Sequence, residues 1–300
     1  MRSGEFVVRA QSNWRGGCGI VIISTRFRLN QSDGSHRPYP FSFHSPVSKL
    51  ASRYLCVPPP MREQDPFALA ASGNLSSRIF RPAEDCSVCR DVQQVDRISS
   101  VDPVDFEERY AYSGRPVVVT DAMMNWTAPR VFSFSFFKSL YDGEDGNCQF
   151  FPYKTEFRSL QDVFDMSSSR SSLQEGTKPW YVGWSNCDEK IGNVLRKHYQ
   201  RPYFLPSTAE SEKTDWIFMG SHGYGAPMHV DDVEHPSWQA QIKGEKLWIL
   251  EPPRECLYTC KRIEVVVEPG EIIVLDTNRW YHQTKIVSDD LSITIGAEYD

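Results

Sequence analysis

The pattern of hydrophobic and polar positions divides the chain into a leader and one folded domain. Residues 1–95 carry Gly, Ser, Arg and Pro without a sustained period, so we expect a poorly ordered leader there. One stretch, Gly19 to Phe27, is apolar enough for a single strand but has no evident hairpin partner. Residues 96–300 show regular patterns and are expected to form the domain.

A helical cap is predicted over residues 102–175. Asp102 is a suitable helix N-cap, and Pro103 suits the first helical position. A short apolar strand is expected at 115–120. A second helix is expected around Phe134 to Tyr141, where aromatic residues recur at helical spacing. These aromatic residues are expected to be core residues of the cap.

From residue 176 to the end, the pattern changes to short β-type segments separated by Gly and Pro. Several short strands at fairly regular spacing are typical of a β-sandwich or barrel. Tight turns are expected at 243–245 and 268–271. The expected strands are Trp180–Trp184, Trp216–Gly220, Met228–Asp231, Trp238–Ile242, Lys246–Leu250, Val265–Val267, Ile272–Leu275, Trp280–Thr284 and Leu291–Ile295.

Composition and charge narrow the functional classes. With 40% hydrophobic and 24% charged residues among 300, the chain has enough apolar side chains for a sizeable core. The net charge of -6 offers no overall basic field, so direct nucleic-acid binding is not expected. The longest apolar run near the start, Gly19 to Ile23, is too short for a membrane span or a signal-peptide core. The oligomeric state stays open.

Eight cysteines leave the redox compartment undecided. Two pairs are close in sequence, Cys86 with Cys89 and Cys256 with Cys260. They could form disulfides, bind zinc together, or remain reduced thiols. Disulfides would place the protein in the lumen of the secretory pathway, whereas thiols would fit the cytoplasm or nucleus.

Three residues form a candidate metal site. His229 and Asp231 are two positions apart in an expected strand, so both side chains would project from the same face. His282, in another expected strand, is a candidate third ligand. Two imidazoles and one carboxylate on one face of an octahedron are typical of non-haem Fe(II) oxygenases. A His-x-Asp triplet also occurs by chance, and Asp232 would point to the opposite face of the strand.

The sequence motifs around this triplet support its interpretation as a metal site. These motifs are Arg115-Pro116-Val117-Val118-Val119 with Trp126, then Gly225-Ala226-Pro227-Met228-His229-Val230-Asp231, then residues 239–253 (QAQIKGEKLWILEPP), then residues 268–275 (EPGEIIVL), and finally Trp280-Tyr281-His282. In this order they resemble the JmjC family of 2-oxoglutarate- and Fe(II)-dependent oxygenases, in its small cupin-like hydroxylase branch, over about residues 102–300.

The resemblance implies a double-stranded β-helix, a jelly-roll or cupin-like barrel in a mainly β fold with a helical cap. It also implies Fe(II) held by His229, Asp231 and His282, which would be the catalytic residues, with 2-oxoglutarate and dioxygen as cosubstrates.

Four further residues are candidates for cosubstrate binding. Lys246 matches the family lysine that holds the distal carboxylate, and a strand-borne ammonium inside a barrel requires an anionic partner. Tyr181 resembles a family tyrosine that reaches the same carboxylate, although it also fits a buried strand tyrosine. Close relatives carry a threonine where this chain has Ala226, and Ser237 or Thr284 could replace its hydrogen bond.

The resemblance favours hydroxylation of a protein or peptide side chain. Lysine or arginine demethylation by the same chemistry is the alternative within the family. Two other classes stay open: a cupin-like binding protein without turnover, and a zinc-dependent hydrolase on the same barrel. The target residue lies beyond the sequence, because selectivity comes from loops around the barrel mouth.

Overall fold

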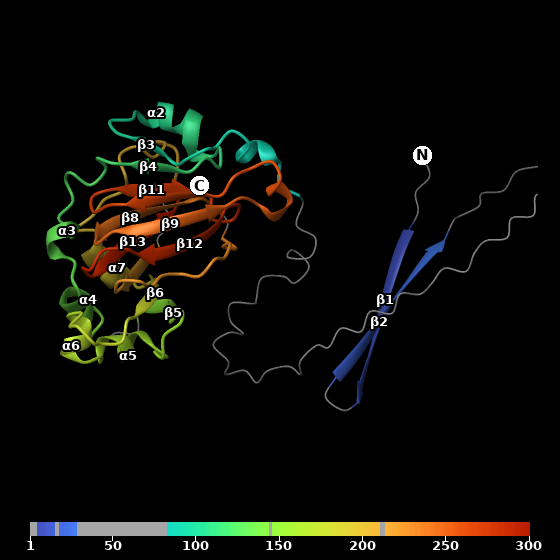
Figure 1. Cartoon of the computed structure of the whole chain (residues 1–300), viewed down its shortest axis with the longest axis horizontal. Coiled ribbons are helices and arrows are strands. Elements are labelled where there is room, and N and C mark those ends of the chain that lie inside the picture. Colours follow the sequence, from blue (N-terminus) through green and yellow to red (C-terminus); the bar gives the residue numbers. More distant parts are fainter. Residues whose placement is uncertain (1–4, 16–17, 29–82, 144–145, 211–213, 234) are drawn as a thin grey trace, which may run out of the picture. The chain divides into compact units, whose positions relative to one another are not determined.

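The computed structural model describes residues 5–15, 18–28, 83–143, 146–210, 214–233 and 235–300. The chain divides into two compact units, Met1–Arg81 and Pro82–Asp300, and each is described by itself (Figure 1). In the first unit, β1 (Glu5–Arg15) pairs with β2 (Cys18–Arg28) as an antiparallel hairpin. The strand expected at 19–27 therefore has a partner. The rest of the expected leader up to residue 82 lies outside the described residues.

The second unit begins before the boundary expected at residue 96. A 3-10 turn, η2 (Cys86–Val88), is capped by Asp85, whose carboxylate accepts a hydrogen bond from the Ser87 backbone amide. Four side chains around this turn are buried: Val88, Cys89, Val92 and Val95. The expectation of a poorly ordered leader is therefore wrong for residues 83–95. This segment has no regular period because it is held by burial and cross-links rather than by a helix or strand.

Two sheets form the core of the second unit. The eight-stranded sheet has the order β3-β4-β11-β8-β13-β7-β6-β5, and the three-stranded sheet has the order β10-β9-β12. The large sheet contains β3 (Asp96–Ile98), β4 (Val117–Val119), β5 (Asn147–Phe151), β6 (Tyr181–Asn186), β7 (Asp215–Gly220), β8 (Ser237–Lys243), β11 (Ile272–Leu275) and β13 (Ser292–Glu298). The small sheet contains β9 (Lys246–Glu251), β10 (Ile263–Val267) and β12 (Tyr281–Ile286).

Short helices accompany the sheets. The expected start at Asp102 is confirmed: its carboxylate caps α2 (Pro103–Phe106), which continues as the π-helical turn η3 (Glu107–Ala111). Ser133 caps α4 (Phe134–Leu140) where the second helix was expected. The others are α3 (Ala128–Val131), α5 (Leu160–Phe164), α6 (Ser168–Ser171), α7 (Glu189–Leu195) and the 3-10 turn η4 (Arg254–Cys256). No helix in the described residues is both long and apolar enough to cross a bilayer.

Alternating side chains give the large sheet two different faces. On β8, Trp238, Ala240 and Ile242 point to the outer face, where they join the aromatic residues of the helical cap in one cluster. On β11, Ile273 and Leu275 point to the inner face and pack against Trp248 of β9 in a second cluster. The two sheets therefore face each other across an apolar interior. This mainly β, cupin-like arrangement with a helical layer confirms the expected fold class.

The strand predictions are largely confirmed, with one error. Met228–Asp231 is not a strand: only an isolated antiparallel bridge joins His229 to His282. Two strands of the large sheet, β3 and β5, were not expected. Both lie at the edges of that sheet, where one flank is unpaired and the apolar pattern is weak.

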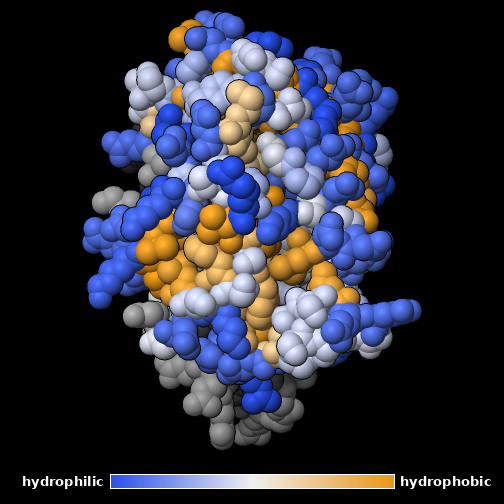
Figure 2. Space-filling model, turned by 90° about the vertical axis from the view of Figure 1, so that its left-hand side faces the viewer, coloured by the Kyte–Doolittle hydropathy of each residue, from blue (hydrophilic) through white to orange (hydrophobic). Residues whose placement is uncertain are grey.

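The helical layer does not conceal all of its apolar surface. Figure 2 shows a band of hydrophobic residues across the face that lies on the left in Figure 1, the side of α3 and α4. Several hydrophobic side chains of this layer are only partly buried: Val131, Phe134, Phe136 and Leu140.

Candidate metal centre

The three predicted metal residues meet in the structure. One ligand atom from each of His229, Asp231 and His282 lies within 4.8 Å of the other two. The Asp231 carboxylate is 3.3 Å from Nε2 of His229 and 3.8 Å from Nε2 of His282. No other group of three or more histidine, cysteine or acidic side chains in the described part of the chain has such spacing.

Backbone hydrogen bonds bring the residues together without a continuous strand. The amide of His229 donates to the carbonyl of His282 at 3.0 Å, and the amide of His282 donates back to the carbonyl of His229 at 2.7 Å. The amide of Asp231 then donates to the Thr277 carbonyl at 2.9 Å. These bonds attach the site to the first residues of β12. The side chains of His229 and Asp231 reach the same site although the backbone between them is not a strand.

The outer nitrogens of both imidazoles are hydrogen-bonded. Nδ1 of His229 lies 2.7 Å from the Pro227 carbonyl oxygen, and Nδ1 of His282 lies 3.1 Å from the Trp280 carbonyl oxygen. A carbonyl accepts only, so Nδ1 carries a proton in each imidazole and Nε2 is the atom left to bind a metal once it has no proton of its own. Orientation of a metal-binding histidine through its second nitrogen is a common feature of metal sites.

Protonation states are consistent with metal binding. Burial lowers the pKa of His282 to about 4, so this imidazole is neutral. Burial raises the pKa of Asp231, but its hydrogen bond to His229 and the charges of both histidines outweigh that effect and lower it. For His229, burial opposes the charged form, yet contact with Asp231 raises the pKa overall. Metal binding requires the neutral imidazole and the ionised carboxylate.

The ligand atoms are close enough together to bind one metal ion. Adjacent ligand atoms at bond lengths of about 2.1 Å are separated by roughly 3–3.5 Å, and the two separations here are 3.3 Å and 3.8 Å. His282 is buried, whereas His229 and Asp231 have about a third of their side-chain surface exposed. The open side of the site therefore lies toward His229 and Asp231.

Lys246 lies inside the barrel, as the sequence predicts. Its side chain is 1% exposed, and its ammonium contacts the hydroxyls of Tyr181 at 3.3 Å and Thr294. Gln241 extends this network, because its carbonyl oxygen accepts a hydrogen bond from Thr294 at 3.0 Å. No carboxylate of the described residues pairs with the ammonium. Burial without a counter-ion lowers the pKa of Lys246 to about 7.

Thr284 lies beside Ala226. The Ala226 amide donates to the Thr284 hydroxyl oxygen at 3.0 Å. The Thr284 hydroxyl therefore lies next to position 226, where close relatives carry a threonine. The same hydroxyl interacts with the hydroxyl of Tyr181 and partly offsets the rise that burial causes in the pKa of Tyr181. Lys246, Tyr181 and Thr284 therefore converge on one place.

Ser237 lies at the start of β8 on the same face as Gln241, since the two are four residues apart. Its hydroxyl is buried and has no hydrogen-bond partner. An unsatisfied buried hydroxyl on the inner face of the barrel is a polar group available to a ligand.

Other polar residues near the triplet in sequence do not join it. His222 is exposed and lies 3.5 Å from the Asp289 carboxylate. Asp232 is exposed, and the candidate metal group includes neither it nor His235. These three residues therefore lie outside the candidate metal group.

The cysteines are joined as disulfides across the two sequence pairs. Cys86 bonds to Cys256 and Cys89 bonds to Cys260, which fastens η2 to the loop around η4. A third disulfide links Cys148 of β5 to Cys187, just beyond β6. Of the three alternatives left open by the sequence, the structure has disulfides, whereas the third bridge had no signal in the spacing.

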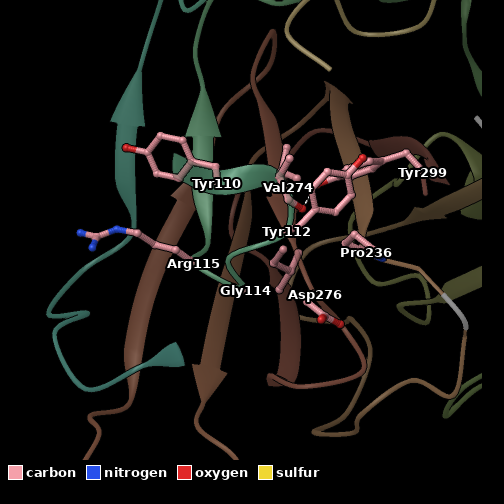
Figure 3. Close-up of a pocket in the computed structure, with 10 residues that line it drawn as sticks. Tyr110, Tyr112, Gly114, Arg115, Pro236, Val274, Asp276 and Tyr299 are labelled. Carbon is pink, nitrogen blue, oxygen red and sulfur yellow. Dashed lines mark hydrogen bonds between the residues drawn. The ribbon is translucent and has the colours of Figure 1, made fainter. Parts of the chain in front are cut away.

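A separate pocket of about 130 Å³ lies where the chain's last residues meet the segment 110–115 and the end of β11 (Figure 3). Polar side chains that line it make hydrogen bonds within the protein. Tyr299 donates to the Ala111 carbonyl, Tyr112 donates to the Asp300 carbonyl, and the Arg115 guanidinium turns away to pair with Asp96. None of the metal or cosubstrate candidates lines this pocket.

Comparison with known proteins gives relatives that are named as a demethylase and as an oxygenase. No family model matches the chain. The "Arginine-specific demethylase JMJ20" of Arabidopsis thaliana is 24% identical, and the match covers 67% of this chain and 56% of that protein. The "2-oxoglutarate and iron-dependent oxygenase JMJD4" of Danio rerio is 31% identical, over 41% of this chain and 38% of that protein.

Among solved structures, ycfD of Escherichia coli superposes with a TM-score of 0.45 and 16% identity, covering 67% of this chain and 53% of that chain. The chain spans about half the length, or less, of the curated relatives that it matches. Together with the ordered motifs, these matches confirm the resemblance seen in the sequence: the chain is similar to the JmjC-type 2-oxoglutarate- and iron-dependent oxygenases.

Proposed function

We propose that this chain is an Fe(II)- and 2-oxoglutarate-dependent oxygenase that hydroxylates a protein side chain. The observation that carries the proposal is the coexistence of two sites in one barrel. One is the His229, Asp231 and His282 triplet, and the other is a buried Lys246 that lacks an acidic partner. A buried ammonium without a counter-ion is costly, and an anionic ligand removes that cost.

The residues divide the task between them. His229, Asp231 and His282 would hold Fe(II) and leave its remaining positions open for 2-oxoglutarate and dioxygen. Lys246, Tyr181 and Thr284 would bind the distal carboxylate, while Ser237 offers a further hydroxyl along β8. When bound, iron and 2-oxoglutarate supply the oxidising chemistry: one atom of dioxygen enters a substrate C–H bond, and the other enters succinate as CO₂ leaves.

The substrate is proposed to be a protein or peptide. The names of the two relatives point to an oxygenase and to an arginine-specific demethylase, and both activities begin with oxidation of a C–H bond. Hydroxylation of a side-chain carbon gives a stable product, whereas hydroxylation of an N-methyl group releases formaldehyde. Mass spectrometry of candidate peptides separates them, because the first reaction adds an oxygen atom and the second removes a methyl group.

An assay of the purified chain tests the function directly. With Fe(II), 2-oxoglutarate and dioxygen, we expect oxygen consumption and succinate formation that stop when any one of the three is omitted. A pure binding protein would bind 2-oxoglutarate without forming succinate, and a zinc hydrolase would retain its activity without oxygen. Either outcome would overturn the proposal.

Substitution of Lys246 by methionine is expected to weaken 2-oxoglutarate binding at least about 30-fold. Loss of one partner of a buried, hydrogen-bonded charge pair costs roughly 2–5 kcal/mol. Calorimetry with the Mn(II)-loaded protein, which binds the cosubstrate without turnover, measures the affinity. Lys243→Met, at the end of β8, is the matched control and should bind as the wild type does. Equal affinities in all three proteins would contradict the assignment of Lys246.

The pKa of about 7 at Lys246 predicts a pH-dependent affinity. Below this pH the free protein already carries the cation that binds the carboxylate. Above it, binding requires uptake of a proton, so affinity should fall by up to about tenfold per pH unit. Calorimetric titrations between pH 6 and pH 9 should show this slope in the wild type but not in Lys246→Arg, because arginine stays charged. A flat profile in the wild type would argue against a titrating Lys246.

We further propose that the chain folds in an oxidising compartment, with the secretory-pathway lumen as the location. Three disulfides among the described residues support this proposal, since such bonds persist mainly outside the cytosol. Peptide mapping without reduction, on protein from its native source, should recover the three cross-linked peptides. Recovery of free thiols at these positions would instead indicate the cytoplasm or nucleus.

A further inference from the structure

Tyr153 has an unusual backbone conformation next to the proposed cosubstrate site. It lies in the turn after β5, where the Thr155 amide donates to the Pro152 carbonyl at 3.0 Å. Its φ of 49° is in the left-handed region, which an aromatic residue seldom adopts. Such conformations persist only where the surrounding structure holds them, and they are concentrated at functional sites. The turn therefore fixes the direction of this side chain.

The side chain folds back over the inner face of the large sheet. The Tyr153 ring lies 5.0 Å from the ring of Tyr181, measured between centroids. Its hydroxyl lies 3.3 Å from the point where a Cβ on Gly183 would stand. Gly183 and Tyr181 are two positions apart on β6 and therefore face the same interior as Lys246. The absence of a side chain at Gly183 leaves room for the Tyr153 hydroxyl.

The Tyr153 hydroxyl has no hydrogen-bond partner among the described residues. In the part of the chain that the structure describes, Tyr153 makes ring contacts but no hydrogen bond. Burial raises the pKa of Tyr153 well above its usual value, and the nearby Tyr181 and Asp231 add to the rise. The hydroxyl is therefore a neutral donor, on a ring that packs against Tyr181, the residue whose hydroxyl contacts Lys246.

We propose that Tyr153 is a positioning residue for the cosubstrate, and that its hydroxyl donates a hydrogen bond to a carboxylate oxygen of bound 2-oxoglutarate. This inference rests on the proposed function. A carboxylate held by Lys246, Tyr181 and Thr284 retains lone pairs for another donor. Tyr153 follows β5, which pairs with β6 on the side away from β7, and its ring packs against Tyr181.

Tyr153→Phe tests the proposal, because it removes the hydroxyl and keeps the ring. In the Mn(II)-loaded full chain, calorimetry should show about tenfold weaker binding of 2-oxoglutarate and of succinate, which lacks the 2-oxo group. The affinity for Mn(II) itself and the melting temperature should stay as in the wild type. Tyr258→Phe is the matched control, since Tyr258 is fully exposed, and it should leave every value unchanged.

The outcomes separate this inference from the proposed function. If the wild type does not bind 2-oxoglutarate, the proposed function fails. If the wild type binds and Tyr153→Phe binds within twofold of it, only the role of Tyr153 is overturned. If 2-oxoglutarate binding is unchanged but turnover of a peptide substrate falls, the hydroxyl contacts the substrate instead, and the proposed contact with the cosubstrate is wrong.

Discussion

Substitution of His229 by alanine is expected to abolish metal-dependent succinate formation and to lower metal affinity by more than about 100-fold. Loss of an outer partner of a metal ligand already costs roughly 10–100-fold, and loss of a ligand itself should exceed that range. The remaining pair, Asp231 and His282, would hold the ion from two points only. Calorimetry with Mn(II) measures the affinity, and succinate formation with Fe(II) measures the activity.

His222→Ala is the control for this prediction. His222 is close to the site in sequence, but it is exposed and its imidazole lies near Asp289 rather than the triplet. The control should bind metal and form succinate as the wild type does. Full activity in His229→Ala would exclude the triplet as the iron site, whatever the control shows.

The sequence predicts the barrel well because its strands alternate. On β9 and β12 every second residue is buried in the interior, and this period is visible without a structure. Lys246 and Thr284, the two candidates for cosubstrate binding on these strands, lie on interior faces. Edge strands such as β3 and β5 carry less of this signal, since one of their flanks is unpaired.

The metal triplet was predicted on partly wrong grounds. A strand through His229 and Asp231 was expected to align the two side chains, whereas the structure aligns them through three backbone hydrogen bonds to β12 and the loop before it. The three residues nevertheless lie together in the structure, as the family motif implies. The local backbone depends on contacts with a segment some fifty positions later, which a local pattern does not contain.

Two features had no signal in the sequence at all. Tyr153 reads as one aromatic residue in a turn, and only its backbone conformation and the space above Gly183 give it a direction. Residues 83–95 likewise have no period, yet four of their side chains are buried against the barrel: Val88, Cys89, Val92 and Val95. Both depend on tertiary contacts between segments that are distant in sequence.

The two disulfides between η2 and the η4 loop should stabilise the domain cooperatively. Each closes a loop of about 170 residues, since the paired cysteines are separated by 170 and 171 positions. In the chain-entropy model such a loop contributes about 5 kcal/mol. Once either bond exists, however, the second closes only a small ring through residues 86–89 and 256–260. That small ring contributes about 2.5 kcal/mol in the same model.

Removing one bond should therefore cost much less than half of what removing both costs. We expect Cys86→Ala with Cys256→Ala, or Cys89→Ala with Cys260→Ala, to lower the free energy of unfolding by about 2.5 kcal/mol each. The fourfold variant should lose about 7–8 kcal/mol, well above the sum of the two. Urea unfolding followed by tryptophan fluorescence measures this, because Trp248 and Trp280 lie in the same apolar cluster as these cysteines. Losses that simply add would mean that the two bonds stabilise independent parts of the structure.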